Sequence, residues 1–282
     1  MDLFPGTLAP KFLADVDERI KITDTQTCFE AHFLFRDFRD MTISLDPLFP
    51  IIYEDDSLLV LHKPADLVCH PTKGDVYSSL ISRVRLYLGE ANEGQMINRI
   101  DRETSGVVLI AKNKETARSL RLQWEAREVV KIYHAISYGW PKENSFSVEE
   151  PLGKDIESEV AIKDCVRRDG SPSFTRFRVL KRFEKNRSKF ALLEVSPRTG
   201  RKHQIRIHLQ HLGHSIVGDK LYGLDEQFYL DLVYGRLTDD QRNQLLLPFH
   251  ALHAHSVTLT HQDQERTFAS EAEDWFRSFH ER

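Results

Sequence analysis

One carboxylate stands between two arginines immediately before a run of apolar residues. Asp101 lies between Arg99 and Arg102 in the segment NRIDRETSG (98–106), which leads into the apolar stretch Val107–Ala111. A carboxylate held among cations keeps a low pKa and stays ionised, so it suits a nucleophile or a base better than a proton donor. The residues alone leave two interpretations open, a structural ion pair and a catalytic carboxylate.

A second polar cluster, TGRKHQIR (199–206), is expected to open a helix. The first N–H groups of a helix and the positive end of its dipole favour an anion. Arg201 and Arg206 are five residues apart and do not share one helix face, so one can contact a phosphate while the other reaches into a cleft. Cations are unfavourable at a helix N-terminus, which favours a functional use over a solvent-facing first turn.

Basic residues are concentrated in two blocks, although the formal net charge is −4. Met96–Lys142 carries nine basic and five acidic side chains, and Ser196–Lys220 carries five basic and one acidic. Residues 1–50 and 225–282 are acidic. The distribution predicts an anion-binding cleft despite the total, with ordinary solvated charges as the alternative.

The composition, 40% hydrophobic and 29% charged, is that of a soluble globular protein. The three cysteines, Cys28, Cys69 and Cys165, form no CxxC pair and indicate neither a disulfide framework nor a thiolate metal site. This cysteine usage and the lack of a visible signal peptide predict a cytoplasmic protein. The apolar stretches are too short to span a bilayer, so no membrane association is expected.

Local patterns predict the elements that must position these residues. Strands are expected at 51–53, 57–61, 107–112, 130–137 and 190–195, and helices at 77–88, 114–128 and after the turn 197–200. Gly106 is expected to supply a positive φ and Gly213 to cap the last helix. Strands and helices alternate without a regular βαβ rhythm, which predicts a mixed α+β domain.

The domain boundary is predicted near residue 50. Residues 1–50 are acidic and weakly periodic, and we expect them to be an N-terminal extension packed on a catalytic main body of residues 51–282. Residues 225–248 are expected to be a surface insertion with helical turns that faces the ligand.

Several ordered motifs resemble those of RNA pseudouridine synthases, in the branch often called RluA. NRIDRETSG (98–106), followed by AK (111–112), resembles the signature HRLDxxTSGxxxxAK. KIYHA (131–135), ending at Gly139, is similar to KxYxAxxxG, and TGRKHQIR resembles TGRTHQxR. GHSIVGD (213–219) with YG (222–223) resembles GHPIxGDxxYG. The resemblance covers roughly residues 51–270.

The sequence departs from these motifs in four places. Asn98 replaces histidine, Ile100 replaces leucine, Lys202 replaces threonine and Ser215 replaces proline. Asparagine can also donate a hydrogen bond, and isoleucine keeps the apolar volume of leucine. None of these changes affects the carboxylate, the tyrosine or the arginines of the motifs.

The resemblance implies roles for individual residues. Asp101 would be the catalytic aspartate, and Arg206 would pair with it and fix its orientation. Tyr133 would stack on the target base and assist proton removal, and Arg99 would fill the space that the flipped uridine leaves. The expected substrate-binding residues are Arg99, Arg102, Thr104, Lys131, Arg201, Lys202 and His203.

The implied activity is the isomerisation of uridine in structured RNA to pseudouridine. The implied fold is a mixed, mostly antiparallel sheet with flanking helices and loops. No cofactor and no metal are expected, because the reaction needs no redox step and no group donor. The expected partner is tRNA or rRNA, with tRNA favoured by the lack of a recognisable small N-terminal RNA-binding module, and the chain is expected to be a monomer without an obligatory protein partner.

Two rival functions remain, an inactive RNA-binding or folding factor on the same scaffold and a nucleoside glycosidase. The combination of Asp101, Tyr133 and Arg206 argues against the first, and the motifs around Arg206 and Asp219 argue against the second.

Two other features are given ordinary interpretations. The histidines at 208, 211, 214, 250, 253 and 255 lie close in sequence but lack cysteine or carboxylate co-ligands, so no metal site is predicted. Trp124 shares a helical stripe with Ala117 and Leu120 and is interpreted as a core residue rather than a base-stacking platform.

Overall fold

The structure is a computed structural model that describes residues 49–71, 79–89 and 94–281. The predicted extension at 1–50 lies outside these residues, apart from Phe49 and Pro50. The strands are β1 Ile51–Glu54, β2 Leu58–Lys63, β3 Gln95–Met96, β4 Ser105–Ala111, β5 Val130–Tyr138, β6 Ser145–Val148, β7 Leu152–Lys154, β8 Asp164–Val166, β9 Thr175–Lys185, β10 Ser188–Pro197, β11 Leu252–His261 and β12 Gln264–Ala269. The helices are α2 Leu80–Leu88, α3 Lys114–Glu125, α4 Gln204–His211, α5 Gln227–Val233, α6 Asp239–Leu245 and α7 Asp274–Glu281.

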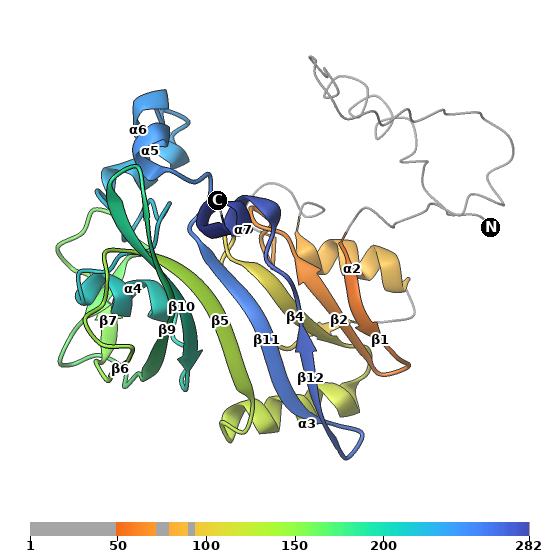
Figure 1. Ribbon diagram of the computed structural model, residues 1–282. Helices are drawn as coiled ribbons and strands as arrows, with labels where there is room; N and C mark the ends of the chain where they lie inside the picture. The colour runs from red at the N-terminus through yellow and green to blue at the C-terminus, as the bar shows by residue number, and fades with distance from the viewer. Residues whose placement is uncertain (1–48, 72–78, 90–93, 282) are drawn as a thin grey trace, which may run out of the picture. The chain divides into compact units, whose positions relative to one another are not determined.

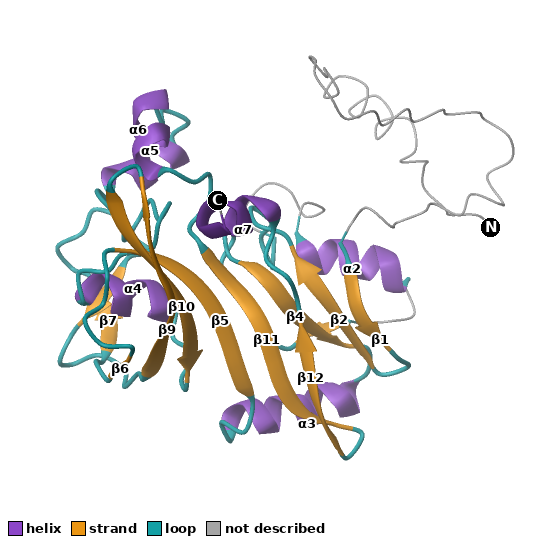
Figure 2. Ribbon diagram, viewed as in Figure 1, coloured by secondary structure: helices purple, strands orange, loops and turns teal. Residues whose placement is uncertain are grey.

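A ten-stranded sheet forms the body of the described chain (Figures 1 and 2). Its order is β1-β2-β4-β11-β5-β10-β9-β6, with β12 paired to β11 and β3 to β4. The pairs are antiparallel except β4 and β11. The prediction of a mixed, mostly antiparallel α+β fold is confirmed.

The parallel pair β4–β11 depends on a glycine. Gly106 has a φ of +116°, as expected, and a Cβ at this position would lie 2.2 Å from the carbonyl oxygen of Ala254. A side chain would therefore prevent the close approach of the two strands. Gly106, the second residue of β4, thus allows β4 to pair with a strand from near the C-terminal end of the sequence.

Helices cover both faces of the β2–β4 region. Leu59 and Ile110 pack with Val84 of α2, whereas Leu58 and Leu109 pack with Leu120 of α3. Alternate strand residues point to opposite faces, so a continuous apolar run such as β4 is buried on both. Figure 1 shows α3 across the ends of β5, β11 and β12.

The other half of the sheet carries α4 and α7. Ile205 and Leu209 of α4 belong to one apolar cluster with Phe190 of β10 and with Phe276 and Phe279 of α7. Gly213, at a φ of +74°, follows the end of α4 and donates its N–H to the carbonyl of Gln210, as its predicted capping role requires.

Three predicted boundaries differ from the structure. The helix predicted at 77–88 begins at Leu80 with Ser79 as its N-cap, and residues 77 and 78 lie outside the described part. The helix predicted to end at 128 ends at Glu125, and Arg127 has a φ of +61°. The helix predicted to follow the turn 197–200 begins only at Gln204, and residues 199–203 form the loop before it.

The segment 225–248 folds into the short helices α5 and α6, which confirms the predicted helical turns. Thr238 caps α6 with a capping box, since its side chain accepts from the Gln241 N–H while the Gln241 side chain accepts from the Thr238 N–H. Among the described residues, no helix is long and apolar enough to cross a membrane.

Histidines collect on one face of the central strands. The rings of His134 and His255 stack at 4.2 Å between centroids. His253 is fully buried, with Nδ1 2.9 Å from Ser105 Oγ and Nε2 2.9 Å from the Ser270 carbonyl. Burial lowers the pKa of His134 to about 4 and that of His253 to about 3.

These histidines predict acid destabilisation. They are neutral when folded, but the unfolded chain binds protons at an ordinary pKa near 6.5, so their contribution is complete above pH 6.5 and is lost as the pH falls toward 4. Each fully buried histidine should cost about 1.4 kcal/mol per pH unit in this window. Urea unfolding between pH 7.5 and 4.5 measures the slope.

The matched variant is His253→Asn, which cannot titrate. It should be less stable at neutral pH but show a shallower loss of stability below pH 6.5. An unchanged slope in this variant would contradict the assignment of acid sensitivity to His253.

Candidate active site

Asp101 lies on the loop between β3 and β4. Asn98, which is buried, fixes the start of this loop: its side chain donates to the Val107 carbonyl at 3.0 Å and accepts from the Leu109 N–H at 2.8 Å. At the other end the Thr104 N–H donates to the Asp101 carbonyl at 3.2 Å. Both hydrogen bonds of Asn98 are therefore used to hold the loop against β4.

The buried side chain of Lys63 holds the same loop through hydrogen bonds to backbone carbonyls. Lys63 Nζ donates to the carbonyls of Arg102, Leu67 and Pro64 at 2.9, 2.8 and 2.8 Å. Burial lowers the pKa of Lys63 to about 8. The ammonium ties the backbone next to Asp101 to the end of β2.

Arg206 joins two carboxylates. Its Nε and Nη2 donate to Asp219 Oδ2 and Oδ1 at 2.7 and 2.9 Å, and its Nη1 donates to Asp101 Oδ2 at 2.9 Å. The guanidinium also lies over the Tyr222 ring, 4.9 Å from its centroid. Asp219 is itself held by the N–H groups of Leu221 and Tyr222, both at 2.9 Å. Arg206 is thus fixed on one side and presents one nitrogen to Asp101.

The charge state of Asp101 follows from these contacts. Burial raises the pKa of its carboxyl, but the Arg206 guanidinium outweighs burial and lowers it below the ordinary value. Burial lowers the pKa of His203 to about 4 and that of His250 to about 3, so both are neutral at pH 7. Arg206 is therefore the cation that keeps Asp101 ionised. The predicted direction is confirmed, but Arg206, rather than the flanking Arg99 and Arg102, is the largest cause of the lowered pKa.

The Asp101 carboxylate keeps one oxygen free. Its side chain is 29% exposed, and within the described residues Oδ1 accepts no hydrogen bond. An ionised carboxylate with one oriented oxygen and one open oxygen can act on a reacting group that binds beside it.

Tyr133 projects from β5 into the same space. Burial, followed by the charge of Asp101, raises the pKa of its phenol, so it stays protonated at neutral pH. Its hydroxyl has no hydrogen-bond partner among the residues that the structure describes. The ring offers an apolar face, and the hydroxyl is better suited to donating a hydrogen bond than to removing a proton.

These residues line one cavity of about 760 Å³. Its wall includes Asp101, Tyr133, Arg206, Arg99, Thr104, Lys131, Arg201, Lys202 and His203. The basic members come from both blocks of basic sequence, and Asp101 is the one acidic residue among the described lining residues. This cavity, which both basic blocks line, is therefore the candidate for the anion-binding cleft that the charge distribution predicts.

Arg102 is placed differently from its prediction. Arg102 is not one of the described residues that line this cavity. Its side chain is 61% exposed, and its Nε donates to Asp66 Oδ1 at 2.7 Å. Adjacent residues of an extended loop point in different directions, so the neighbour of Asp101 turns to solvent.

The remaining predicted residues have specific contacts. Lys202 Nζ pairs with Asp164 at 2.9 Å, and His203 Nδ1 lies 3.0 Å from the Tyr222 hydroxyl. Thr104 Oγ1 lies 2.7 Å from His250 Nε2.

Sequence reasoning missed two groups of this site. Asp219 was recognised within a motif but not as the residue that holds Arg206. His250, which is buried between Thr104 and Glu103, was noted only as a possible metal ligand. The Gly218-Asp219 motif was an available signal for the first, whereas His250 stands in no comparable local pattern.

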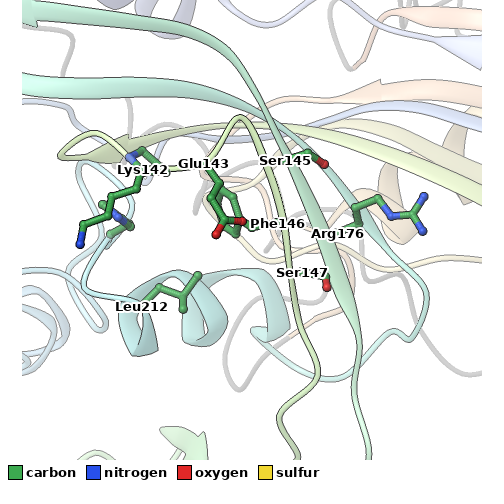
Figure 3. Close-up of a pocket in the computed structure, with 9 residues that line it drawn as sticks. Lys142, Glu143, Ser145, Phe146, Ser147, Arg176 and Leu212 are labelled. Carbon is green, nitrogen blue, oxygen red and sulfur yellow. The ribbon is translucent and has the colours of Figure 1, made fainter.

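A second cavity, of about 750 Å³, lies at the β6–β9 edge of the sheet (Figure 3). Its wall includes Lys142, Glu143, Phe146, Arg176 and Leu212. Figure 3 shows the Arg176 guanidinium directed away from Lys142 and Leu212. Its charged groups do not converge, so this cavity is a poorer candidate for catalysis.

Among the described residues no group of three or more histidine, cysteine, aspartate or glutamate side chains is arranged to hold a metal ion. His208, one of the clustered histidines, instead lies 2.9 Å from both Ser173 Oγ and Thr175 Oγ1.

Residues 57–211 match the family described as RNA pseudouridylate synthase. The matched range includes the Asp101 loop, Tyr133 and Arg206. This chain belongs to the RNA pseudouridylate synthase family. Asp219, the second partner of Arg206, lies just beyond the matched residues.

This pseudouridylate synthase family member is similar to bacterial relatives in sequence and to a human relative in structure. It is 36% identical over 215 residues to a ribosomal large subunit pseudouridine synthase C of Vibrio parahaemolyticus, covering 76% of this chain and 62% of the relative. It is 37% identical over 183 residues to a dual-specificity RNA pseudouridine synthase RluA of the same organism, covering 64% and 72%. The human RNA pseudouridylate synthase domain containing 1 has a similar structure, with a TM-score of 0.63, 25% identity and coverage of 81% and 85%.

The match to several curated relatives is partial. The chain spans 62% of the Vibrio parahaemolyticus synthase C and 54% of the corresponding synthase of Vibrio cholerae.

Proposed function

We propose that this chain isomerises uridine in structured RNA to pseudouridine, with Asp101 as the catalytic carboxylate. The observation that carries the proposal is the geometry around Arg206, which holds Asp101 ionised and leaves its Oδ1 open in a cavity with basic walls. The family membership supports the same reaction. We further propose that the chain acts as a monomer on its RNA.

In the proposed reaction the N1–C1′ bond breaks, the uracil turns, and a C5–C1′ bond forms. The proton on C5 leaves and N1, which carries none in uridine, gains one, so the atoms balance without an oxidant or a group donor. Asp101 supplies the negative charge at the reacting sugar and base, and Arg206 fixes its orientation through a rigid planar fork. Tyr133 would stack on the base, which must leave its RNA stack to reach a recessed carboxylate.

Tritium at C5 of uridine tests the reaction directly. Total RNA labelled with [5-³H]uridine, taken from cells that lack the gene, should release tritium to water when the purified chain is added, and digestion should yield pseudouridine. Release of free uracil would instead indicate a nucleoside glycosidase. Tight RNA binding with neither product would indicate an inactive RNA-binding factor. Sequencing after chemical labelling of pseudouridine separates tRNA from rRNA targets.

The basic cavity wall predicts salt-sensitive binding. Arg201 is exposed at the cavity and forms no ion pair among the described residues, so Arg201→Gln should weaken RNA binding several-fold and reduce the slope of log affinity against log salt by roughly one contact. Asp274→Asn on α7, an exposed carboxylate that does not line the cavity, is the matched control and should leave the slope unchanged. Fluorescence anisotropy between 50 and 300 mM salt measures both, and equal slopes for wild type and Arg201→Gln would place the RNA elsewhere.

A further inference from the structure

Trp124 packs on the core, as its helical spacing predicts, but only with part of its side chain. It is half-buried at the end of α3, where it packs on the cluster of Leu109 and Leu120. It also lines the cavity that contains Asp101. Its indole is thus supported from behind by the core and open toward the cavity, which is the arrangement of a rigid stacking platform.

The indole N–H of Trp124 is available to a ligand. The other two tryptophans of the chain use theirs, since Trp140 donates to the Phe183 carbonyl at 3.2 Å and Trp275 donates to Glu273 at 3.0 Å. Trp124 makes no such hydrogen bond within the described part of the chain. A half-buried indole normally finds an acceptor, so this donor suits an acceptor that arrives with the substrate.

The ammonium of Lys131 lies over the face of the indole. Its Nζ lies 5.9 Å from the centroid of the Trp124 ring, and Lys131 lines the same cavity. It forms no ion pair with any residue that the structure describes, and burial followed by the charge of Arg127 lowers the pKa of its ammonium. A half-buried cation of this kind gains most from an anion supplied by a ligand.

The position of this pair relative to Tyr133 indicates what it binds. Lys131 and Tyr133 are two residues apart on β5 and share its cavity-facing side, which separates them by roughly 6.6 Å along the strand. This is about twice the 3.4 Å spacing of stacked nucleotides in a strand. The spacing suits two successive nucleotides that are no longer stacked on each other.

We propose that Trp124 and Lys131 form a binding subsite for the nucleotide next to the target uridine, whose base takes the place of the lysine over the indole while its phosphate pairs with the displaced lysine. The proposal rests on the proposed function for the identity of the base at Tyr133. It adds a recognition element outside the reacting centre, and it makes binding depend on an unpaired neighbour that can leave the RNA stack.

The fluorescence of Trp124 tests the stacking. In the double variant Trp140→Phe/Trp275→Phe, Trp124 is the remaining tryptophan, and hexauridylate should quench its emission in a saturable manner. The matched control is Trp124→Phe/Trp275→Phe, which keeps Trp140. Trp140 also carries a lysine over its ring, with Lys189 Nζ 4.6 Å from the centroid, but it does not line the Asp101 cavity, so it should not be quenched.

Affinity supplies a second measurement. Trp124→Leu should weaken hexauridylate binding about tenfold, because one base–aromatic stack is lost, while Trp124→Phe should retain most of the affinity. Absence of saturable quenching of Trp124 at concentrations that saturate binding would overturn the subsite, whether or not the leucine variant folds. Pseudouridine formation without this quenching would defeat the subsite alone, and quenching without pseudouridine formation would defeat the proposed function alone.

Discussion

Replacing Asp101 with asparagine is expected to lower the rate of pseudouridine formation by at least about 10³-fold, a typical loss for an essential catalytic group. Asparagine keeps the shape of the side chain but removes the charge that Arg206 stabilises and the nucleophilic oxygen. Single-turnover tritium release measures the rate. Folding and RNA affinity should change little, because Asp219 still pairs with Arg206 through two hydrogen bonds.

Asp66→Asn is the matched control for this variant. Asp66 is an exposed carboxylate that pairs with Arg102, one residue beyond Asp101, and asparagine tolerates its φ of +68°. It should keep nearly the full rate. More than about a hundredth of the wild-type rate in Asp101→Asn would show that the carboxylate is not the essential group.

Arg206→Lys should lower the single-turnover rate by at least about 100-fold although the charge is kept, since a displacement of 1 Å at a reacting group can have this effect. The guanidinium contacts Asp219 with two nitrogens and Asp101 with the third. A lysine ammonium lacks the planar fork and cannot reproduce this geometry. The Asp101 side chain would lose its fixed orientation.

Arg201→Lys separates this effect from a loss of positive charge in the cavity. Arg201 lines the same cavity, but its Nε donates to the Pro172 carbonyl rather than to Asp101, so the change should alter the rate only slightly. Urea unfolding of Arg206→Lys checks that the fold remains stable when Asp101 and Asp219 no longer have the arginine between them. A normal single-turnover rate in a folded Arg206→Lys protein would mean that this pairing does not orient Asp101.

Local patterns were sufficient for the elements that carry the site. The apolar run of β4, the helical stripe of α3 and the alternation of β5 are properties of neighbouring residues, so their types were readable from the sequence. Strand β9 was not predicted, because its exposed positions carry charged residues such as Arg176 and Arg178, and its strand structure depends on pairing with β10.

The contacts that determine the chemistry were harder to predict from the sequence. Arg102 was expected at the site because it follows Asp101, but the direction of a side chain on a loop is not given by its place in the chain. Trp124 has the spacing of a core residue, and only the three-dimensional arrangement brings its other side to the cavity. The anchoring of the Asp101 loop by Lys63 joins residues 39 positions apart, which no local pattern encodes.

The place of β11 in the sheet affects when the protein can become active during its synthesis. This strand, residues 252–261, lies between β4 and β5, and its Ala254 contacts Gly106 at the end of the Asp101 loop. During synthesis on a ribosome, β4 and β5 emerge more than a hundred residues before β11 and cannot complete this part of the sheet until β11 has emerged. Contacts between such distant parts of a chain form late and slowly. A nascent chain from which β11 has not yet emerged should therefore lack the assembled Asp101 site.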